Sequence, residues 1–398
     1  MLRVVEAIAT GVEEVIQEER SLDKVTSFWL KQHKNWDQSE KVFFVEILHG
    51  VVRWWRLLNE LKFSGHVNFG NQYRNAVTNY LALNFDVTLL RGAVTPSYQK
   101  KVKNSVQQVK STRAISQSIP NWLDELGFEE LGSRWAIELD ALNKSPELII
   151  RANRLKTSRE ELIGWLKREH YKVSAMDIPD AIHVSGRVNI FKSEAFRLGM
   201  FEQQDHSSQQ VIPFLEVEPG MRIIDACAGN GGKTLHAASI MGNKGRIIAM
   251  DNAEWKLTEL RRRIRRAGAT NAETRFIESS KTVKRLKDSA DRLLLDVPCS
   301  GLGVLRRNPD SKWRLTLSRI DELKKIQSDI LSRYWVMVKP KGKMVYATCS
   351  ILPSENEQQV RQFIEGSNGR FVLEDEKKIS PYDSGFDGFY MARLRRDF

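Results

Sequence analysis

The chain has few cysteines and no long apolar run. Its 3 cysteines are spread over 398 residues, which does not suit a disulfide framework, and none has a second metal ligand at the usual spacing. We therefore expect a reducing compartment and no metal. No uncharged stretch is long enough to cross a membrane, and Glu6, Glu13 and Glu14 interrupt the apolar N-terminal pattern, which argues against a signal peptide. These absences favour a cytoplasmic protein without a membrane partner.

Basic residues outnumber acidic residues in the chain, and one segment has no acidic residue at all. The chain has 62 Lys and Arg against 50 Asp and Glu, a net charge of +12. This excess favours a polyanionic partner, most simply nucleic acid, although a merely basic protein is the alternative. Between Asp86 and Asp124 there is no acid, and the segment is either an arm that contacts an RNA backbone or a solvated connector. Its basic residues are Arg91, Lys100, Lys101, Lys103, Lys110 and Arg113.

The length and the hydrophobic patterns predict three domains. Residues 1–118 form a helical domain followed by the basic linker, because apolar residues recur at helical spacing. Residues 119–202 form a small α+β module, in which Glu147 to Lys156 alternates like a strand and Ala181 to Lys192 suggests two short strands. In residues 203–398 strands and helices alternate, which predicts an α/β domain with a parallel sheet covered on both faces.

The strands of that sheet are short apolar runs separated by helical patterns. The expected strands are Arg222 to Asp225, Arg246 to Asp251, Arg275 to Ile277, Arg292 to Asp296 and Lys343 to Ala347, and the expected helices begin at Lys233, Ala253 and Ser318. Gly388 to Leu394 is expected as an edge strand. In such sheets ligands bind at the carboxyl ends of the strands.

A glycine-rich loop follows the first of these strands. The stretch MRIIDACAGNGGKT, from Met221 to Thr234, runs from a strand through an acid and a turn into a helix. Glycines allow close approach of a ligand, and the start of the helix offers free N–H groups. A phosphate-binding P-loop is excluded because it needs glycine where Cys227 stands. Asp251 ends the next strand, where an acid can accept hydrogen bonds from a ribose. The pattern indicates a nucleotide-type cofactor, and a tight helix–strand turn is the alternative.

Two cysteines lie at the ends of further strands. RLLLDVPCSGLGVLRRNPD, from Arg292 to Asp310, presents Asp296 and Cys299 before a pair of arginines, and KMVYATCS brings Cys349 to the end of a later strand. Either thiol alone would be interpreted as a small buried hydrophobe. Two thiols and an acid at one edge of a sheet favour a reactive site.

The chain resembles the Sun/Fmu family of RNA (cytosine-5) methyltransferases in three stretches. In chain order these are DACAGNGGKT, LDVPCSG followed by RRNPDSKW, and YATCSILPSENE. The resemblance extends to IIRANRLK, to the pair Gln204 and Asp205, and to DGFYMA, and it covers residues 119–398. SLDKV, HGVVRWW and RNAVTNYLAL resemble the NusB-like domain of the family's bacterial small-subunit rRNA member. The resemblance implies a Rossmann-like domain with S-adenosylmethionine as cofactor. It also implies that the protein is a monomer and that its substrate is 16S rRNA. A tRNA substrate and a non-catalytic assembly factor are the alternatives.

The resemblance also implies roles for single residues. Cys349 is the nucleophile that adds to C6 of cytosine, and Cys299 assists product release, whereas DNA cytosine methyltransferases use the Pro-Cys thiol. Asp296 protonates the ring near N3, and Lys233 reaches the catalytic centre. The implied cofactor contacts are Asp225, Cys227, Ala228, Gly229, Asn230, Gly231, Gly232, Lys233, Asp251, Ser279 and Asp296. The implied RNA contacts are Arg151, Asn153, Lys156, Arg306 and Arg307.

The chain departs from the family pattern at two places. The family has Ala-Pro-Gly where this loop has Gly229, Asn230 and Gly231, and a family acid at the adenine end falls near Ser279, with Glu278 beside it. A cluster of arginines, at positions 261, 262, 263, 265 and 266, either contacts RNA phosphates or forms a solvated helix face.

Overall fold

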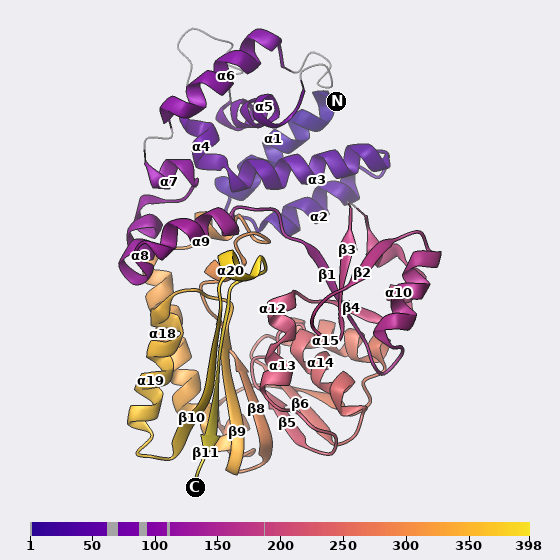
Figure 1. The fold of residues 1–398 in the computed structure, drawn as a ribbon, viewed down its shortest axis with the longest axis vertical. Helices are drawn as coiled ribbons and strands as arrows, with labels where there is room; N and C mark the ends of the chain where they lie inside the picture. The colour runs from indigo at the N-terminus through magenta and orange to yellow at the C-terminus, as the bar shows by residue number, and fades with distance from the viewer. Residues whose placement is uncertain (1, 62–70, 87–93, 110–111, 187) are drawn as a thin grey trace. The chain divides into compact units, whose positions relative to one another are not determined.

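The computed structural model describes residues 2–61, 71–86, 94–109, 112–186 and 188–398 (Figure 1). Arg91 and Lys110 of the predicted basic segment lie outside these residues. The chain forms two compact units, one of Met1–Lys144 with Leu305–Leu317 and the other of Ser145–Val304 with Ser318–Phe398. Within the described ranges, no helix has the length and apolar character needed to span a membrane.

The first unit is helical, as the sequence predicts. Its helices are α1 Leu2–Ile16, α2 Leu22–Gln32, α3 Gln38–Arg53, α4 Trp55–Glu60, α5 Gln72–Asn84, α6 Pro96–Val109, α7 Arg113–Ser116, α8 Asn121–Leu131, α9 Arg134–Leu142 and α17 Ser311–Arg314. α3 begins with a capping box, in which the Asp37 side chain accepts from the Glu40 N–H and the Glu40 side chain accepts from the Asp37 N–H. Ile8, Phe44 and Leu48 are fully buried in one core, so tertiary packing of apolar faces stabilises the helices.

The first unit is larger than the predicted helical domain. It extends past residue 118 to Lys144, and it includes the segment Leu305–Leu317, which the sequence assigned to the α/β domain. Buried hydrogen bonds explain the inclusion, because Lys312 Nζ donates to the Arg53 carbonyl at 2.8 Å and Arg53 Nη2 donates to the Arg306 carbonyl at 2.7 Å. The RRNPDSKW motif is therefore part of the helical unit.

The second unit contains the small α+β module. Its four-stranded antiparallel sheet has the order β2-β3-β1-β4. The elements are β1 Leu148–Ala152, α10 Arg159–Arg168, β2 Lys172–Ala175, β3 Ala181–Ser185, α11 Glu194–Arg197 and β4 Phe201–Gln203. The second strand expected within Ala181 to Lys192 is wrong, because Ile190–Lys192 is a 3-10 turn in which the Phe191 N–H donates to the side chain of Asn189.

The remainder of the second unit is a seven-stranded sheet with the order β10-β11-β9-β8-β5-β6-β7. The strands are β5 Arg222–Asp225, β6 Arg246–Asp251, β7 Ala272–Phe276, β8 Ala290–Asp296, β9 Val338–Thr348, β10 Phe371–Ile379 and β11 Phe389–Arg396. Strands β5 to β9 pair in parallel and β10 and β11 are antiparallel, which confirms the α/β prediction. The predicted edge strand is wrong in its position, since β11 lies between β9 and β10.

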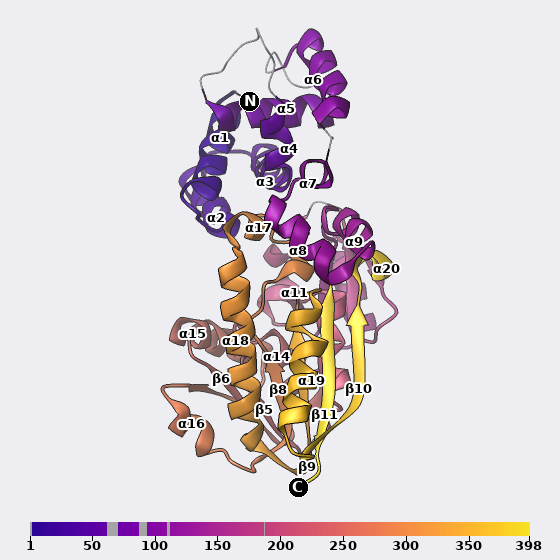
Figure 2. The same ribbon diagram turned by 90° about the vertical axis from the view of Figure 1, so that its left-hand side faces the viewer.

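Helices cover both faces of this sheet, as Figure 2 shows for α18 and α19 on one face. The helices of this part of the chain are α12 His206–Gln209, α13 Val211–Phe214, α14 Gly232–Met241, α15 Glu254–Ala267, α16 Ser280–Lys284, α18 Leu317–Tyr334, α19 Glu357–Gly366 and α20 Pro381–Ser384. Successive strand residues alternate between the faces: Ile224 packs in the core of α16, α18 and α19, while Ile223 packs in the core of α13 and α14. Because β5, β6, β8 and β9 run parallel, their carboxyl ends lie at the same edge of the sheet.

Candidate active site

The glycine-rich loop after β5 is held by backbone hydrogen bonds. The Ala228 N–H donates to the Met250 carbonyl at 2.9 Å, and the Gly231 N–H donates to the Ala228 carbonyl at 2.8 Å. Gly231 has φ +83°, and a Cβ there would lie 2.0 Å from a methyl carbon of Leu260. Only glycine suits this position, because the left-handed backbone and the close packing of α15 both disfavour a side chain.

A buried acid lies under this loop. Asp225, at the end of β5, is 2% exposed, and its Oδ2 accepts from the Thr234 hydroxyl at 2.6 Å. Its Oδ1 is buried with no hydrogen-bond donor. Burial, together with the charges of Asp296 and Asp251, raises the pKa of Asp225 to about 7. An unpaired carboxylate oxygen beside a glycine turn suits a ligand that carries an amino group, as S-adenosylmethionine does.

Asp251, at the end of β6, is fixed by backbone donors. Its Oδ2 accepts from the Gly229 N–H and its Oδ1 from the Ala253 N–H, both at 2.9 Å. Each oxygen keeps a lone pair that can accept from a ribose hydroxyl. Ser279 lies after β7 as the exposed N-terminal neighbour of α16, and Glu278 beside it is also exposed. The residues present thus fit the cofactor at the amino and ribose ends.

The predicted arginine cluster on α15 makes internal contacts that sequence reasoning missed. Arg263 Nη1 donates to the Asn230 carbonyl at 2.7 Å, and Arg263 Nη2 lies 2.8 Å from the Glu202 carboxylate. Arg266 pairs with the same carboxylate, which is 2% exposed on β4. Arg261 pairs with Glu254. Part of this cluster therefore holds the cofactor loop and the small module.

The two predicted thiols meet at the ends of β8 and β9. Cys299 Sγ and Cys349 Sγ lie 3.4 Å apart, within sulfur hydrogen-bond distance, and both cysteines are free. A hydrogen bond that its S–H donates to Cys349, then burial, and further the charge of Glu355 raise the pKa of the Cys299 thiol well above its ordinary value. Cys227 also has a raised thiol pKa, first through burial and then through the charge of Asp225. Cys299 and Cys227 are therefore thiols at neutral pH.

The predicted lysine and acid also meet. Lys233 Nζ donates to Asp296 Oδ2 at 2.7 Å, and the same ammonium lies 5.0 Å from the centre of the Phe389 ring. Asp296 ends β8, and Cys299 follows in the same loop. The structure therefore brings a lysine–carboxylate pair and a thiol pair to the same edge of the sheet.

One buried carboxylate joins the two cysteine loops. Glu355 is fully buried, and it accepts from the Ser300 N–H at 2.8 Å, from the Ser300 hydroxyl and from the Ser350 hydroxyl. Gln327 Nε2 donates to the same carboxylate at 3.0 Å. Ser300 follows Cys299 and Ser350 follows Cys349. The stretch YATCSILPSENE contains Glu355, but its pattern alone gave no sign of this contact.

Three of the predicted RNA contacts have buried side chains with internal partners in this structure, and their contact with RNA stays a prediction. Arg151 is 1% exposed and donates to the Gly232 carbonyl at 3.0 Å. Asn153 donates to the carbonyls of Gly199 and Ala267, both at 2.8 Å. Arg306 is 3% exposed and donates to the Ala141 carbonyl at 2.9 Å in the helical unit. Lys156 is exposed and Arg307 is half-buried, so an RNA contact by these two stays a prediction.

The site combines a glycine loop between β5 and α14, an acid at the end of β6, and an acid and two thiols at the ends of β8 and β9. These features define a Rossmann-like methyltransferase that uses S-adenosylmethionine. Residues 212–395 match the model described as 16S rRNA methyltransferase RsmB/F, and residues 119–191 match the RsmF/B-like ferredoxin-like domain. The chain belongs to the RsmB/F family, which confirms the resemblance. The NusB-like character of its helical unit stays a prediction.

Individual relatives agree with this assignment. A probable ribosomal RNA small subunit methyltransferase B of Synechocystis sp. is 34% identical over 319 residues, which are 75% of this chain and 71% of the relative. Ribosomal RNA small subunit methyltransferase B of Yersinia enterocolitica is 35% identical over 283 residues, 69% of this chain and 66% of the relative. The crystal structure of PH0851 has the same fold, with a TM-score of 0.82 and 24% identity over 98% of this chain and 99% of that one.

Proposed function

We propose that this protein methylates C5 of a cytosine in 16S rRNA through a covalent bond between Cys349 and C6 of the base. The observation that carries the proposal is the pair of thiols 3.4 Å apart at the ends of β8 and β9. The names of the relatives support small-subunit rRNA as the substrate. The Lys233–Asp296 pair on the same sheet edge supports acid chemistry on the ring.

The need for a thiol follows from the substrate. C5 of cytosine is a poor nucleophile, and addition of a thiolate to C6 places electron density on C5. A free thiol has a pKa of about 8.5 and is only a few per cent ionised at neutral pH. The family resemblance assigns the nucleophile to Cys349, and the raised pKa of Cys299 keeps that second thiol protonated. The Cys299 S–H can then donate to the Cys349 sulfur and stabilise its negative charge.

The proton steps use the lysine–carboxylate pair. As the Cys349 sulfur bonds to C6, a proton reaches N3 from Asp296, and the Lys233 ammonium that donates to Asp296 is a source of that proton. S-adenosylmethionine, when bound, supplies an electrophilic methyl group for C5. The C5 proton then leaves to a solvent base, N3 returns its proton to the Lys233–Asp296 pair, and the C6–S bond breaks. Its electron pair returns to Cys349 while Cys299 donates to that sulfur, which assists product release.

The test is methyl transfer from labelled S-adenosylmethionine to purified rRNA and tRNA separately, followed by digestion to nucleosides. We expect label in 5-methylcytosine from rRNA, and label from tRNA alone would move the substrate. Cys349→Ala should abolish transfer, whereas Cys299→Ala should accumulate a protein–RNA adduct that survives denaturing electrophoresis. Full transfer by Cys349→Ala would refute the choice of nucleophile.

A further inference from the structure

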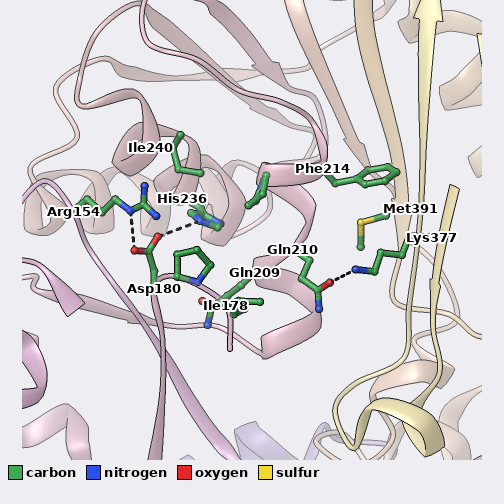
Figure 3. Close-up of a pocket in the computed structure, with 12 residues that line it drawn as sticks. Arg154, Ile178, Asp180, Gln209, Gln210, Phe214, His236, Ile240, Lys377 and Met391 are labelled. Carbon is green, nitrogen blue, oxygen red and sulfur yellow. Dashed lines mark hydrogen bonds and ion pairs between the residues drawn. The ribbon is translucent and has the colours of Figure 1, made fainter. Parts of the chain in front are cut away.

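The second unit contains a cavity of about 280 Å³ away from the thiols. It lies between the loop of the small module that ends at Asp180, helices α13 and α14, and strands β10 and β11 (Figure 3). Neither cysteine of the thiol pair lines it. Pockets for drug-sized ligands usually have volumes of about 300–1,000 Å³, so this cavity suits a smaller group such as one aromatic ring system.

The walls of the cavity are mostly apolar. Pro179, Pro213, Phe214, Ile240 and Met391 line it, and Figure 3 shows Phe214, Ile240 and Met391 around the space. Among these side chains Phe214 carries a flat aromatic ring, and unpaired RNA bases are bound by stacking on such rings.

The wall on α14 presents one buried polar group without a partner. His236 is 3% exposed, and its Nδ1 is buried with no hydrogen bond. Its Nε2 lies 3.9 Å from Asp180 Oδ2, which is too long for a hydrogen bond. Burial, with the charges of Arg151, Arg154 and Lys233, lowers the pKa of His236 well below its ordinary value. A neutral imidazole has one donor and one acceptor, which match the edge of a base.

Cations lie at the rim. Lys377 Nζ on β10 donates to Gln210 Oε1 at 2.6 Å, and Lys377 is exposed. Arg154 Nε lies 2.8 Å from Asp180 Oδ1, and its side chain is 47% exposed. Because Asp180 offsets only one of these two cations, the rim keeps a positive charge that suits a phosphate.

We propose that this cavity binds one unpaired nucleobase of the RNA, with its edge hydrogen-bonded to His236 and its phosphate near Lys377. The inference rests on the proposed RNA substrate, but it concerns a base other than the one that reaches the thiols. The second base would fix the register of the RNA strand on the enzyme.

The direct test uses the wild-type protein and the four nucleoside 5′-monophosphates as probes. The chain has 7 histidines, so an imidazole ¹⁵N NMR spectrum is simple, and His236→Phe identifies the His236 resonances. We expect at least one monophosphate to shift the His236 signals in a saturable way. If none of the four shifts them at millimolar concentration, the proposal is overturned.

A kinetic test separates this pocket from the chemistry. His236→Phe keeps a flat ring but removes the hydrogen-bonding edge, and it should raise KM for RNA about tenfold with little change in kcat. Lys377→Ala should do the same more weakly. Lys378→Ala, which removes the same charge from the next residue of β10, is the matched control and should change nothing.

The two proposals can fail separately. Unchanged KM in both His236→Phe and Lys377→Ala, with normal methyl transfer by the wild type, would refute the pocket and leave the proposed function standing. A monophosphate that shifts His236 in a protein that transfers no methyl group would support the pocket and refute the proposed function.

Discussion

Replacing Glu355 with glutamine tests how the two thiols are held together. The carboxylate accepts hydrogen bonds from the Ser300 N–H, the two serine hydroxyls and Gln327. A hydrogen bond to a charged group contributes about 1.5–3 kcal/mol. Glutamine keeps one acceptor oxygen but turns a donor toward groups that also donate, so we expect the free energy of unfolding to fall by about 3 kcal/mol.

The larger effect should be on turnover. A displacement of about 1 Å of a reacting group can reduce the rate about a hundredfold, and Glu355 is the carboxylate that ties the loop of Cys299 to the loop of Cys349. We therefore expect kcat for methyl transfer to fall about a hundredfold in Glu355→Gln. KM for S-adenosylmethionine should stay the same, because the hydrogen bonds of the glycine loop do not involve Glu355.

A second measurement distinguishes electrostatics from simple loosening. The pKa of Cys299 is raised by the hydrogen bond that its S–H donates to Cys349, by burial and by the charge of Glu355. Removing that charge should shift the pH profile of Cys299 alkylation by iodoacetamide to lower pH. Glu357→Gln is the matched control, since Glu357 lies nearby but pairs with Lys378. Wild-type turnover together with an unchanged alkylation profile in Glu355→Gln would refute the reasoning.

Three further predictions concern buried charges. Asp225 has a pKa raised from 3.8 to about 7 in the folded state, so folding favours its protonated form, and this stability is lost as pH rises from about 4 to about 7. Asp225→Asn should remove that loss, which urea unfolding of the cofactor-free protein at several pH values will show; a constant difference between the two proteins would contradict it. Glu202→Gln should leave Arg263 less well fixed and raise KM for S-adenosylmethionine about tenfold, with a smaller change in kcat. The control Glu254→Gln, on the exposed part of α15, should leave this KM unchanged. Arg306→Ala should lower the free energy of unfolding by about 2 kcal/mol but leave the salt dependence of RNA binding unchanged, and a smaller salt slope would restore the phosphate contact predicted from the sequence.

The sheet was predictable where its strands are buried. Arg222–Asp225 and Arg246–Asp251 were predicted with the bounds that the structure has, because short apolar runs between helices are typical of parallel strands. β10 was missed because its interior residues are exposed and mostly charged. An edge strand needs no apolar run, since charged residues there protect it from further pairing. Because β10 was not predicted, β11 was predicted as the edge strand.

The grouping of the predicted site residues could be foreseen from the sequence, but the contacts that support them could not. Cys299, Cys349, Asp296 and Lys233 belong to motifs at the ends of strands, and strand order brings them together. The role of Arg151 depends on tertiary packing, because its partner Gly232 lies far along the chain. A buried arginine that donates to a backbone carbonyl has the same local sequence pattern as an exposed one that binds phosphate. Charge alone therefore predicts a partner without telling whether the partner is internal.

The internal partners explain why the small module is joined to the cofactor loop. Arg151 on β1 donates to the carbonyl of Gly232, and Glu202 on β4 holds Arg263, which donates to the carbonyl of Asn230. Both carbonyls belong to the loop whose family Ala-Pro is replaced by Gly229 and Asn230. Glycine adds backbone freedom that must be lost when a ligand binds. Charged donors from outside the loop can limit that freedom before binding, so the module contributes to the cofactor site as well as to any contact with RNA.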